Sequence, residues 1–319
     1  FDLFTLGRSL EASIRDGDSI VKLEEYADRL LQFKENKMHL INVSQDIEFL
    51  EDTFMHKGVN HHAAVCKTDF GVAWVNNLGC YLYDGQKVTN LLEKGGRQII
   101  KESNWSSFIT DNSIIGYIPK KRQLIVLKDC TATSVGDIYL YDMVTQSWVE
   151  GDSKFTDSQI QTNFITDWNG DLIHAHTSDT GTVEKWDDSG DSSATFSTIT
   201  KDIDFGQPSQ RKKIYKVYVS YKGDGTSVTI NYTTNGDNDT YSGQFYRCNA
   251  DGSTTGSTAS NVPLHQASVG TDDWINAELK PTASINNIYS LQLKFDGDTS
   301  DPNFEINDIS IVYRLKNVK

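Results

Sequence analysis

Histidines are the first residues of this chain whose spacing could support chemistry. His174 and His176 lie two apart in a segment that we expect to be a strand, so their side chains would share one face and could ligate a metal ion. His61 and His62 could supply a third ligand in space. The same pattern is typical of half-exposed strand histidines that bind nothing. The sequence therefore leaves both interpretations open and favours the second.

The cysteines give weaker indications of a chemical site than the histidines. Cys66, Cys80, Cys130 and Cys248 contain no CxxC pair, which favours reduced thiols over a zinc site or a disulfide framework. Thiol catalysis requires a neighbouring histidine. His62 precedes Cys66 by four residues, and in an extended strand that separation is roughly 13 Å. We therefore expect Cys66 to be a buried structural residue.

Acidic and arginine side chains also fail to form a recognisable catalytic pattern. Asp237-x-Asp239 and Asp296-x-Asp298-x-x-Asp301 supply oxygen ligands of the kind that calcium binds, but neither fits the EF-hand loop. Residues 177–181 (Thr-Ser-Asp-Thr-Gly) approach the Asp-box turn of sialidases, with the following aromatic residue, Trp186, placed too late. The arginines that could clamp a carboxylate are scattered: Arg8, Arg15, Arg29, Arg97 and Arg122.

Nucleotide and hydrolase motifs are missing from the sequence as well. There is no P-loop, no GxSxG elbow and no GxGxxG segment after a strand. We therefore expect no enzyme, no catalytic residue, no cofactor and no metal.

The elements around these residues are expected to be strands. The chain has 319 residues, enough for two domains, and its 14 Tyr, 14 Phe and 6 Trp suit pleated, half-buried surfaces. The formal net charge is −14; residues 1–200 hold 18 Lys and Arg against 30 Asp and Glu, and residues 201–319 hold 12 against 14. Such an acidic surface disfavours a nucleic-acid binder, because phosphate contacts require Lys and Arg. No apolar run is long enough for a membrane span, so we expect no membrane partner.

An internal repeat dominates residues 1–200. Four strands end in an aromatic residue, precede a polar turn and lead into a second strand; these aromatic residues are Phe33, Tyr83, Tyr141 and Trp186. Further strand pairs precede three of the hairpins: residues 62–66 with 72–75, 114–118 with 123–127, and 164–168 with 172–175. Units of about four strands repeated every ~40–50 residues are typical of β-propeller blades. Residues 194–199 are expected to complete the last unit.

One segment has an alternative interpretation as a helix. Residues 22–37 place Leu23, Tyr26, Leu30 and Phe33 near helical spacing, but the neighbouring repeats favour strands. Because the chain begins with Phe1, we also expect that blades upstream are missing.

The pattern changes near residue 200, which indicates a second domain over residues 201–319. Tyr215, Val217, Val219 and Tyr221 alternate on one face, and Gly223-Asp224-Gly225 indicates a hairpin turn into a strand from Val228. Residues 233–272 predict exposed loops around a short strand at 243–247. Tyr289 to Phe295 and Phe304 to Tyr313 also alternate, the latter with a bulge at Asn307-Asp308. Such strands predict a β-sandwich, as in a jelly roll.

Two resemblances follow from short motifs. Residues 141–148, Tyr-Asp-Met-Val-Thr-Gln-Ser-Trp, are similar to the hairpin of kelch repeats, which implies a turn capped by Asp and Thr and a Trp packed between blades; the Gly-Gly doublet of a kelch repeat is absent. Tyr83-Asp84-Gly85, and residues 201–206 (Lys-Asp-Ile-Asp-Phe-Gly) leading into the sandwich, resemble the propeller-containing tail and connector proteins of bacteriophages, especially the tail nozzle proteins of short-tailed phages.

The second resemblance implies a virion protein that is made and assembled in the host cytoplasm. It would form a homo-oligomeric ring, usually a hexamer, around the DNA exit channel and contact other tail and portal-adaptor proteins. DNA would pass without sequence-specific binding, and an acidic lumen would not hold its phosphates. Two alternatives remain: a carbohydrate-binding or carbohydrate-active protein, with Trp168 and Trp274 as platforms, and a kelch-like interaction scaffold.

Overall fold

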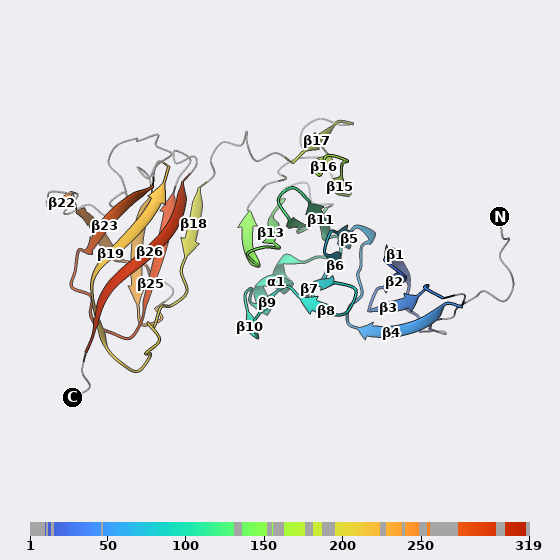
Figure 1. The fold of residues 1–319 in the computed structure, drawn as a ribbon, viewed down its shortest axis with the longest axis horizontal. Helices are drawn as coiled ribbons and strands as arrows, with labels where there is room; N and C mark the ends of the chain where they lie inside the picture. The colour runs from blue at the N-terminus through green and yellow to red at the C-terminus, as the bar shows by residue number, and fades with distance from the viewer. Residues whose placement is uncertain are drawn as a thin grey trace. The chain divides into compact units, whose positions relative to one another are not determined.

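The computed structural model is all-β and divides into two compact units, Phe1–Trp186 and Asp187–Lys319 (Figure 1). Strands form because β-branched and aromatic residues alternate along most of the chain. The structure describes residues 10, 12–13, 16–45, 47–130, 136–151, 155, 163–175, 181–186, 195–223, 228–237, 240–248, 254–255, 274–297 and 304–316.

Among the described residues the first unit contains one two-stranded sheet and four larger antiparallel sheets, and each of these four follows the order of the chain. The first sheet consists of β1 (Ile20–Tyr26), β2 (Arg29–Lys34), β3 (Lys37–Asn42) and β4 (Phe49–Met55). The second consists of β5 (Val65–Thr68), β6 (Gly71–Asn76), β7 (Gly79–Tyr83) and β8 (Val88–Asn90). The third consists of β11 (Ile114–Ile118), β12 (Gln123–Leu127), β13 (Ile138–Asp142) and β14 (Ser147–Gly151). The fourth consists of β15 (Ile165–Thr166), β16 (Leu172–Ala175) and β17 (Val183–Lys185).

These sheets bury apolar residues against one another. One core cluster combines side chains of the first three sheets, and Phe33 of β2 meets Trp74 of β6 edge to face at 5.3 Å. In β12 successive residues alternate: Leu124 belongs to this cluster, whereas Ile125 belongs to a second cluster shared with the fourth sheet. The third sheet is therefore covered on both faces, as a period of two requires.

The third and fourth sheets approach closely at Gly116. A Cβ atom there would lie 2.7 Å from the Cβ of Phe164, so only glycine fits without a shift.

Most strand predictions for this unit are confirmed. Residues 22–37 form the β1–β2 hairpin and no helix, because Leu31 and Phe33 alternate into the core. The pair at 114–118 and 123–127 has the predicted bounds. Residues 62–66 were predicted as a strand; instead η1 (His62–Ala64), a short 3-10 helix, precedes β5, because the His61 side chain accepts a hydrogen bond from the Ala63 N–H and caps the turn.

The predicted repeat is out of phase in two places. Tyr83 and Tyr141 lie on the third strands of their sheets, and Trp186 directly follows the third strand of the fourth sheet, but Phe33 lies on a second strand. Residues within 194–199 do not complete the fourth sheet: β18 (Phe196–Ile199) pairs with β25 (Leu291–Gly297) of the second unit. Hydrophobic alternation alone does not identify a strand's partner.

The segment between the second and third sheets was not predicted from the sequence. It contains a short pair, β9 (Glu93–Lys94) and β10 (Arg97–Gln98), followed by α1 (Glu102–Phe108). Trp105 of α1 is fully buried and stacks on Tyr139, and its Nε1 donates to the Asn76 carbonyl at 2.9 Å. Trp148 meets Trp105 edge to face and donates its own Nε1 to the Leu91 carbonyl at 2.9 Å. Two indoles thus join the second and third sheets.

The second unit is one folded sheet. Its strands are β18, β19 (Lys212–Lys222), β20 (Thr229–Thr234), β21 (Gly243–Cys248), β22 (Thr254–Thr255), β23 (Ile275–Pro281), β24 (Asn286–Ile288), β25 and β26 (Glu305–Leu315). The order along the sheet is β18-β25-β20-β21-β23-β19, with β24 and β26 both on β19 and β22 on β21. A single core takes side chains from β19, β20, β21, β23 and β25. Because β21 pairs with β20 at one end and β23 at the other, it is the strand at which the sheet turns.

Several predictions for this unit need correction. No β19–β20 hairpin is present among the described residues, since β19 pairs with β23, β24 and β26 while β20 pairs with β21 and β25. Residues 224–227 of the expected turn lie outside the described part. Tyr215 faces outward, because a bulge between Ile214 and Lys216 changes the alternation.

Other predictions for this unit are confirmed. Leu291, Leu293 and Phe295 are buried, and β21 has nearly the predicted bounds. The register of β26 skips Asn307, where a bulge was expected.

Residues 196–203 bond along β25, as in the Ile203 N–H to Leu291 carbonyl bond of 2.8 Å, so the boundary predicted between residues 200 and 201 falls inside this segment.

Candidate functional site

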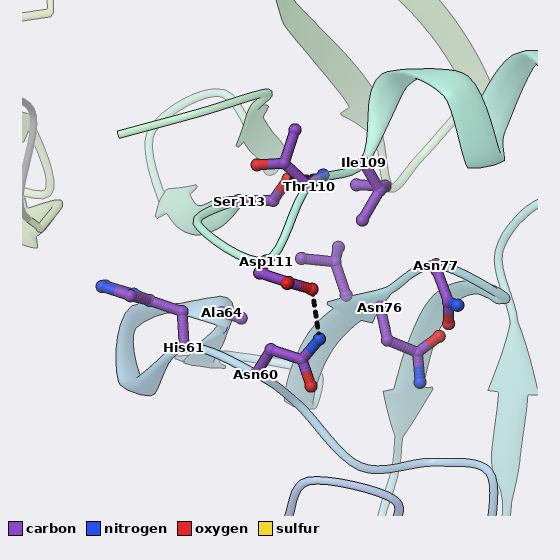
Figure 2. Close-up of a pocket in the computed structure, with 10 residues that line it drawn as sticks. Asn60, His61, Ala64, Asn76, Asn77, Ile109, Thr110, Asp111 and Ser113 are labelled. Atoms are coloured by element: carbon purple, nitrogen blue, oxygen red, sulfur yellow. Dashed lines mark hydrogen bonds between the residues drawn. The ribbon is translucent and has the colours of Figure 1, made fainter. Parts of the chain in front are cut away.

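A small cleft in the first unit is lined by side chains from two segments that are distant in the sequence. The segment before η1 and the 109–113 turn after α1 face each other across it. Asn60 Nδ2 donates to Asp111 Oδ1 at 2.6 Å, and Figure 2 shows these two side chains pointing toward one another. His61 follows Asn60, and its Nε2 lies 3.9 Å from the Cys130 Sγ. Sequence spacing gave no indication of this pair, because the two residues are far apart along the chain.

The protonation of the pair argues against thiol catalysis. His61 Nδ1 accepts a hydrogen bond from the Ala63 N–H at 3.1 Å, so the proton of the neutral ring is on Nε2, the atom that faces Cys130. Burial, and then the charge of His62, lower the pKa of His61. Burial raises the pKa of the Cys130 thiol. The pair therefore contains a neutral thiol in place of the reactive thiolate. The imidazole nitrogen that faces this thiol already carries a proton, so it cannot act as the base that would remove the proton of the thiol.

The pair that the sequence analysis considered, His62 and Cys66, lies on different elements. His62 begins η1 and contacts His61 in a tilted arrangement with ring centroids 4.3 Å apart, whereas Cys66 lies on β5 against the core. Burial raises the pKa of Cys66 to about 12. Cys66 is half-buried against this core, so its structural role stays a prediction, and Cys80 is fully buried in the same core.

His174 is a core residue of the fourth sheet. Its Nδ1 donates to the Ala175 carbonyl at 2.8 Å, and its ring meets Phe155 edge to face at 5.1 Å. His176 lies outside the described residues. Across the part that the structure describes, no three His, Cys, Asp or Glu side chains gather as metal ligands.

The acidic segments are only partly described. Asp296 on β25 forms an ion pair with Lys294 at 2.9 Å, and Asp237 closes a turn onto the Thr234 carbonyl. Asp239, Asp298 and Asp301 lie outside the described residues, as do Thr177, Ser178, Asp179 and Thr180 of the Asp-box-like segment. Trp186 is half-buried against Phe155.

The described arginines of unit one lie on separate elements. Arg29 on β2 binds Glu51 with two hydrogen bonds, of 3.0 and 3.2 Å; Arg97 is on β10, and Arg122 is in the β11–β12 turn. Arg8 and Arg15 lie outside the described residues. These three arginines therefore do not come together as a site that could bind a carboxylate.

The kelch-like hairpin has the local geometry that its sequence implies. Asp142 Oδ1 accepts hydrogen bonds from the N–H groups of Val144 and Thr145, both at 2.8 Å. Thr145 Oγ1 contacts Ser147 Oγ at 2.7 Å, and Trp148 reaches the second sheet. The turn is therefore a structural device that fixes the Trp148 indole between sheets.

Trp168 is the most exposed aromatic residue of the candidate set. It is 93% exposed in the turn between β15 and β16, where Asp167 Oδ1 accepts from the Asn169 and Asp171 N–H groups at 2.9 and 2.8 Å. Asp171 also forms ion pairs with Lys120 and Lys185, both at 2.7 Å. These bonds hold the turn while the indole faces solvent. Trp274, at the start of β23, is 50% exposed.

None of the helices in the described ranges is long and apolar enough to cross a membrane. A scan against protein-family models finds no family that matches this chain, and a search of curated proteins finds no similar sequence.

Proposed function

We propose that this protein is a structural component of a bacteriophage tail, a nozzle or connector subunit that forms a ring around the DNA exit channel and acts by assembly. The observation that supports this proposal most is the first unit, with three four-stranded sheets and a three-stranded sheet, each in simple up-and-down order and packed face to face. In this proposal these sheets are propeller-like blades and the second unit is a β-sandwich.

The chemistry of the described residues agrees with a role without catalysis. The pair of His61 and Cys130 is neutral, and the cysteines Cys66 and Cys80 have raised pKa values because burial disfavours their thiolates. In several polar turns an aspartate side chain accepts hydrogen bonds from backbone N–H groups of the same turn. In the β7–β8 turn Asp84 accepts from the Gln86 and Lys87 N–H groups at 2.9 Å. Such side chains already have partners and stabilise hairpins.

The charge distribution agrees with a channel. Residues 1–200 hold 30 acidic against 18 basic side chains, and an acidic wall repels the phosphates of a sliding duplex. In this proposal other tail and portal-adaptor proteins contact the two ends of the ring, and the protein is found in virions.

Imaging the native assembly by electron microscopy tests this role. We expect a closed ring, usually sixfold, with acidic residues of the first unit facing its lumen. Replacing several of those residues with Lys should leave the ring intact and slow DNA passage, with an effect that weakens as salt rises. Isolated monomers, or rings whose acidic residues all face outward, would contradict the channel role.

Carbohydrate binding is the second candidate, because Trp168 presents a fixed, exposed indole of the kind that stacks on sugar rings. Glycan-array binding that Trp168→Ala abolishes and Trp274→Ala preserves would favour it. Absence of binding in both the parent protein and Trp274→Ala would reject it.

A further inference from the structure

β26 is the longest exposed edge of the second unit. This strand has eleven residues, Glu305–Leu315, and within the described part of the chain it pairs only with β19. Its other edge therefore presents backbone N–H and C=O groups that no described strand bonds. Natural proteins usually shorten, bend or charge such an edge, because it is a template for another strand.

The middle of β26 lacks these protections. Residues 308–315 pair with β19 without a skipped residue on β26, whose own bulge lies at Asn307; the second bulge of this pair lies on β19, where Tyr215 is the extra residue opposite Val312 and Tyr313. The stretch Ile309–Tyr313 has no charge, no proline and no glycine. Val312 is 44% exposed and Tyr313 is 38% exposed. This part of the edge is thus continuous, uncharged and accessible.

Charges flank this stretch with opposite signs. Asp308 precedes it and Arg314 follows it, and both side chains are exposed. Two parallel copies would place Asp308 opposite Asp308. Two antiparallel copies related by a two-fold axis at Ile311 would place Asp308 opposite Arg314 twice. Opposite charges stabilise a cross-strand pair and like charges destabilise it.

The same register also matches the faces of the strand. Ile309 and Ile311 pack against the core of the unit, while Ser310 and Val312 are exposed between them. With the axis at Ile311, Ile309 of one copy faces Tyr313 of the other, and Ser310 faces Val312. Every pair then joins residues of the same face, so the two sheets continue into each other.

We propose that two copies of this chain associate through the free edge of β26, antiparallel about Ile311, with Asp308 of each copy opposite Arg314 of the other. This contact is isologous, and it does not depend on the proposed virion role. A ring with only sixfold symmetry has no such axis, so a ring would be joined through other surfaces.

A charge-swap series on the full chain tests the contact by sedimentation velocity over a range of protein concentrations. For the parent protein we expect a reversible association of two copies through β26, which adds to the proposed ring where that ring forms. Asp308→Arg and Arg314→Asp should each weaken the dimer about tenfold or more, because each reversal places two like-charged pairs in the interface. The double variant D308R/R314D should restore the parent affinity. Asp52→Arg, an exposed reversal on β4, is the matched control and should change nothing.

Three outcomes would overturn the proposal: a parent protein without this dimer contact at every concentration, single reversals without effect, or a double variant weaker than either single one. The thermal transition of each variant shows whether it is folded. Hydrogen exchange gives a second measurement on the parent protein, in which the amides of residues 309–313 should exchange more slowly as concentration rises; equal exchange at all concentrations would contradict the contact. A ring without the charge-swap pattern rejects this inference alone, and a charge-swap dimer without a ring rejects the virion role alone.

Discussion

The two units of this chain bury their apolar side chains in different ways. In the first, each sheet is built from strands that are neighbours in the sequence, and separate sheets cover one another. In the second, one sheet turns at β21 and pairs strands that are distant in the sequence, such as β18 with β25 and β19 with β26. Local pairing produces repeated blocks, whereas distant pairing produces a single core that requires the whole segment.

The largest expected effect concerns the junction between the second and third sheets. Trp105→Ala should destabilise the first unit by about 3–5 kcal/mol, because it removes a fully buried indole that contacts Tyr139 and Trp148. Calorimetry of the full chain measures it. If the units unfold separately, only the first-unit transition should move; a matched shift of both transitions would contradict that separation.

A smaller effect concerns the start of the second unit. A fragment of residues 187–319 should unfold cooperatively and be about 1.5–3 kcal/mol more stable than residues 201–319, because the shorter fragment lacks β18 and the stacking of Phe196 on Phe304 at 5.7 Å. Denaturant titrations of the two fragments measure this difference. Equal stabilities would show that β18 contributes nothing, and an unfolded longer fragment would contradict the division into two units.

The smallest effect is the acid response of the kelch-like turn. Backbone hydrogen bonds, first from Thr145 and then from Val144, lower the pKa of Asp142. A carboxyl whose folded pKa is lower than its unfolded pKa contributes stability above the unfolded value, and this contribution is lost as pH falls through the folded value. The parent protein should therefore lose more stability than Asp142→Asn below about pH 4. Parallel acid titration curves for the two proteins would contradict this role.

The comparison also explains what the sequence could predict. The pair at 114–118 and 123–127 was predicted with its bounds, because period-two alternation and a short turn are local properties. The prediction of a β19–β20 hairpin was wrong, because hydrophobic alternation identifies the two faces of a strand but not the strand that it pairs with. The outward position of Tyr215 could not be predicted either, because the bulge that causes it lies in the pairing of β19 with β26. The helix α1 was missed because its seven residues are too few for a helical period.

Sites were harder to predict than strands. The separation of Cys66 from His62 was argued from an extended strand, but His62 lies in η1, and the structural role of Cys66 stays a prediction. The pair of His61 and Cys130 was missed because only the packing of η1 against the third sheet brings the two residues together. No local motif contains that contact. The exposed edge of β26 was likewise invisible, because exposure depends on which strands pair.

Native mass measurement of the full chain tests the central claim, assembly, most directly. The proposed tail role predicts one large species, sixfold in the usual case, that persists on dilution, with the β26 contact added at higher concentration. A protein that remains a monomer under the same conditions would contradict the assembly role. The description of the two β units would then stand without a function in assembly.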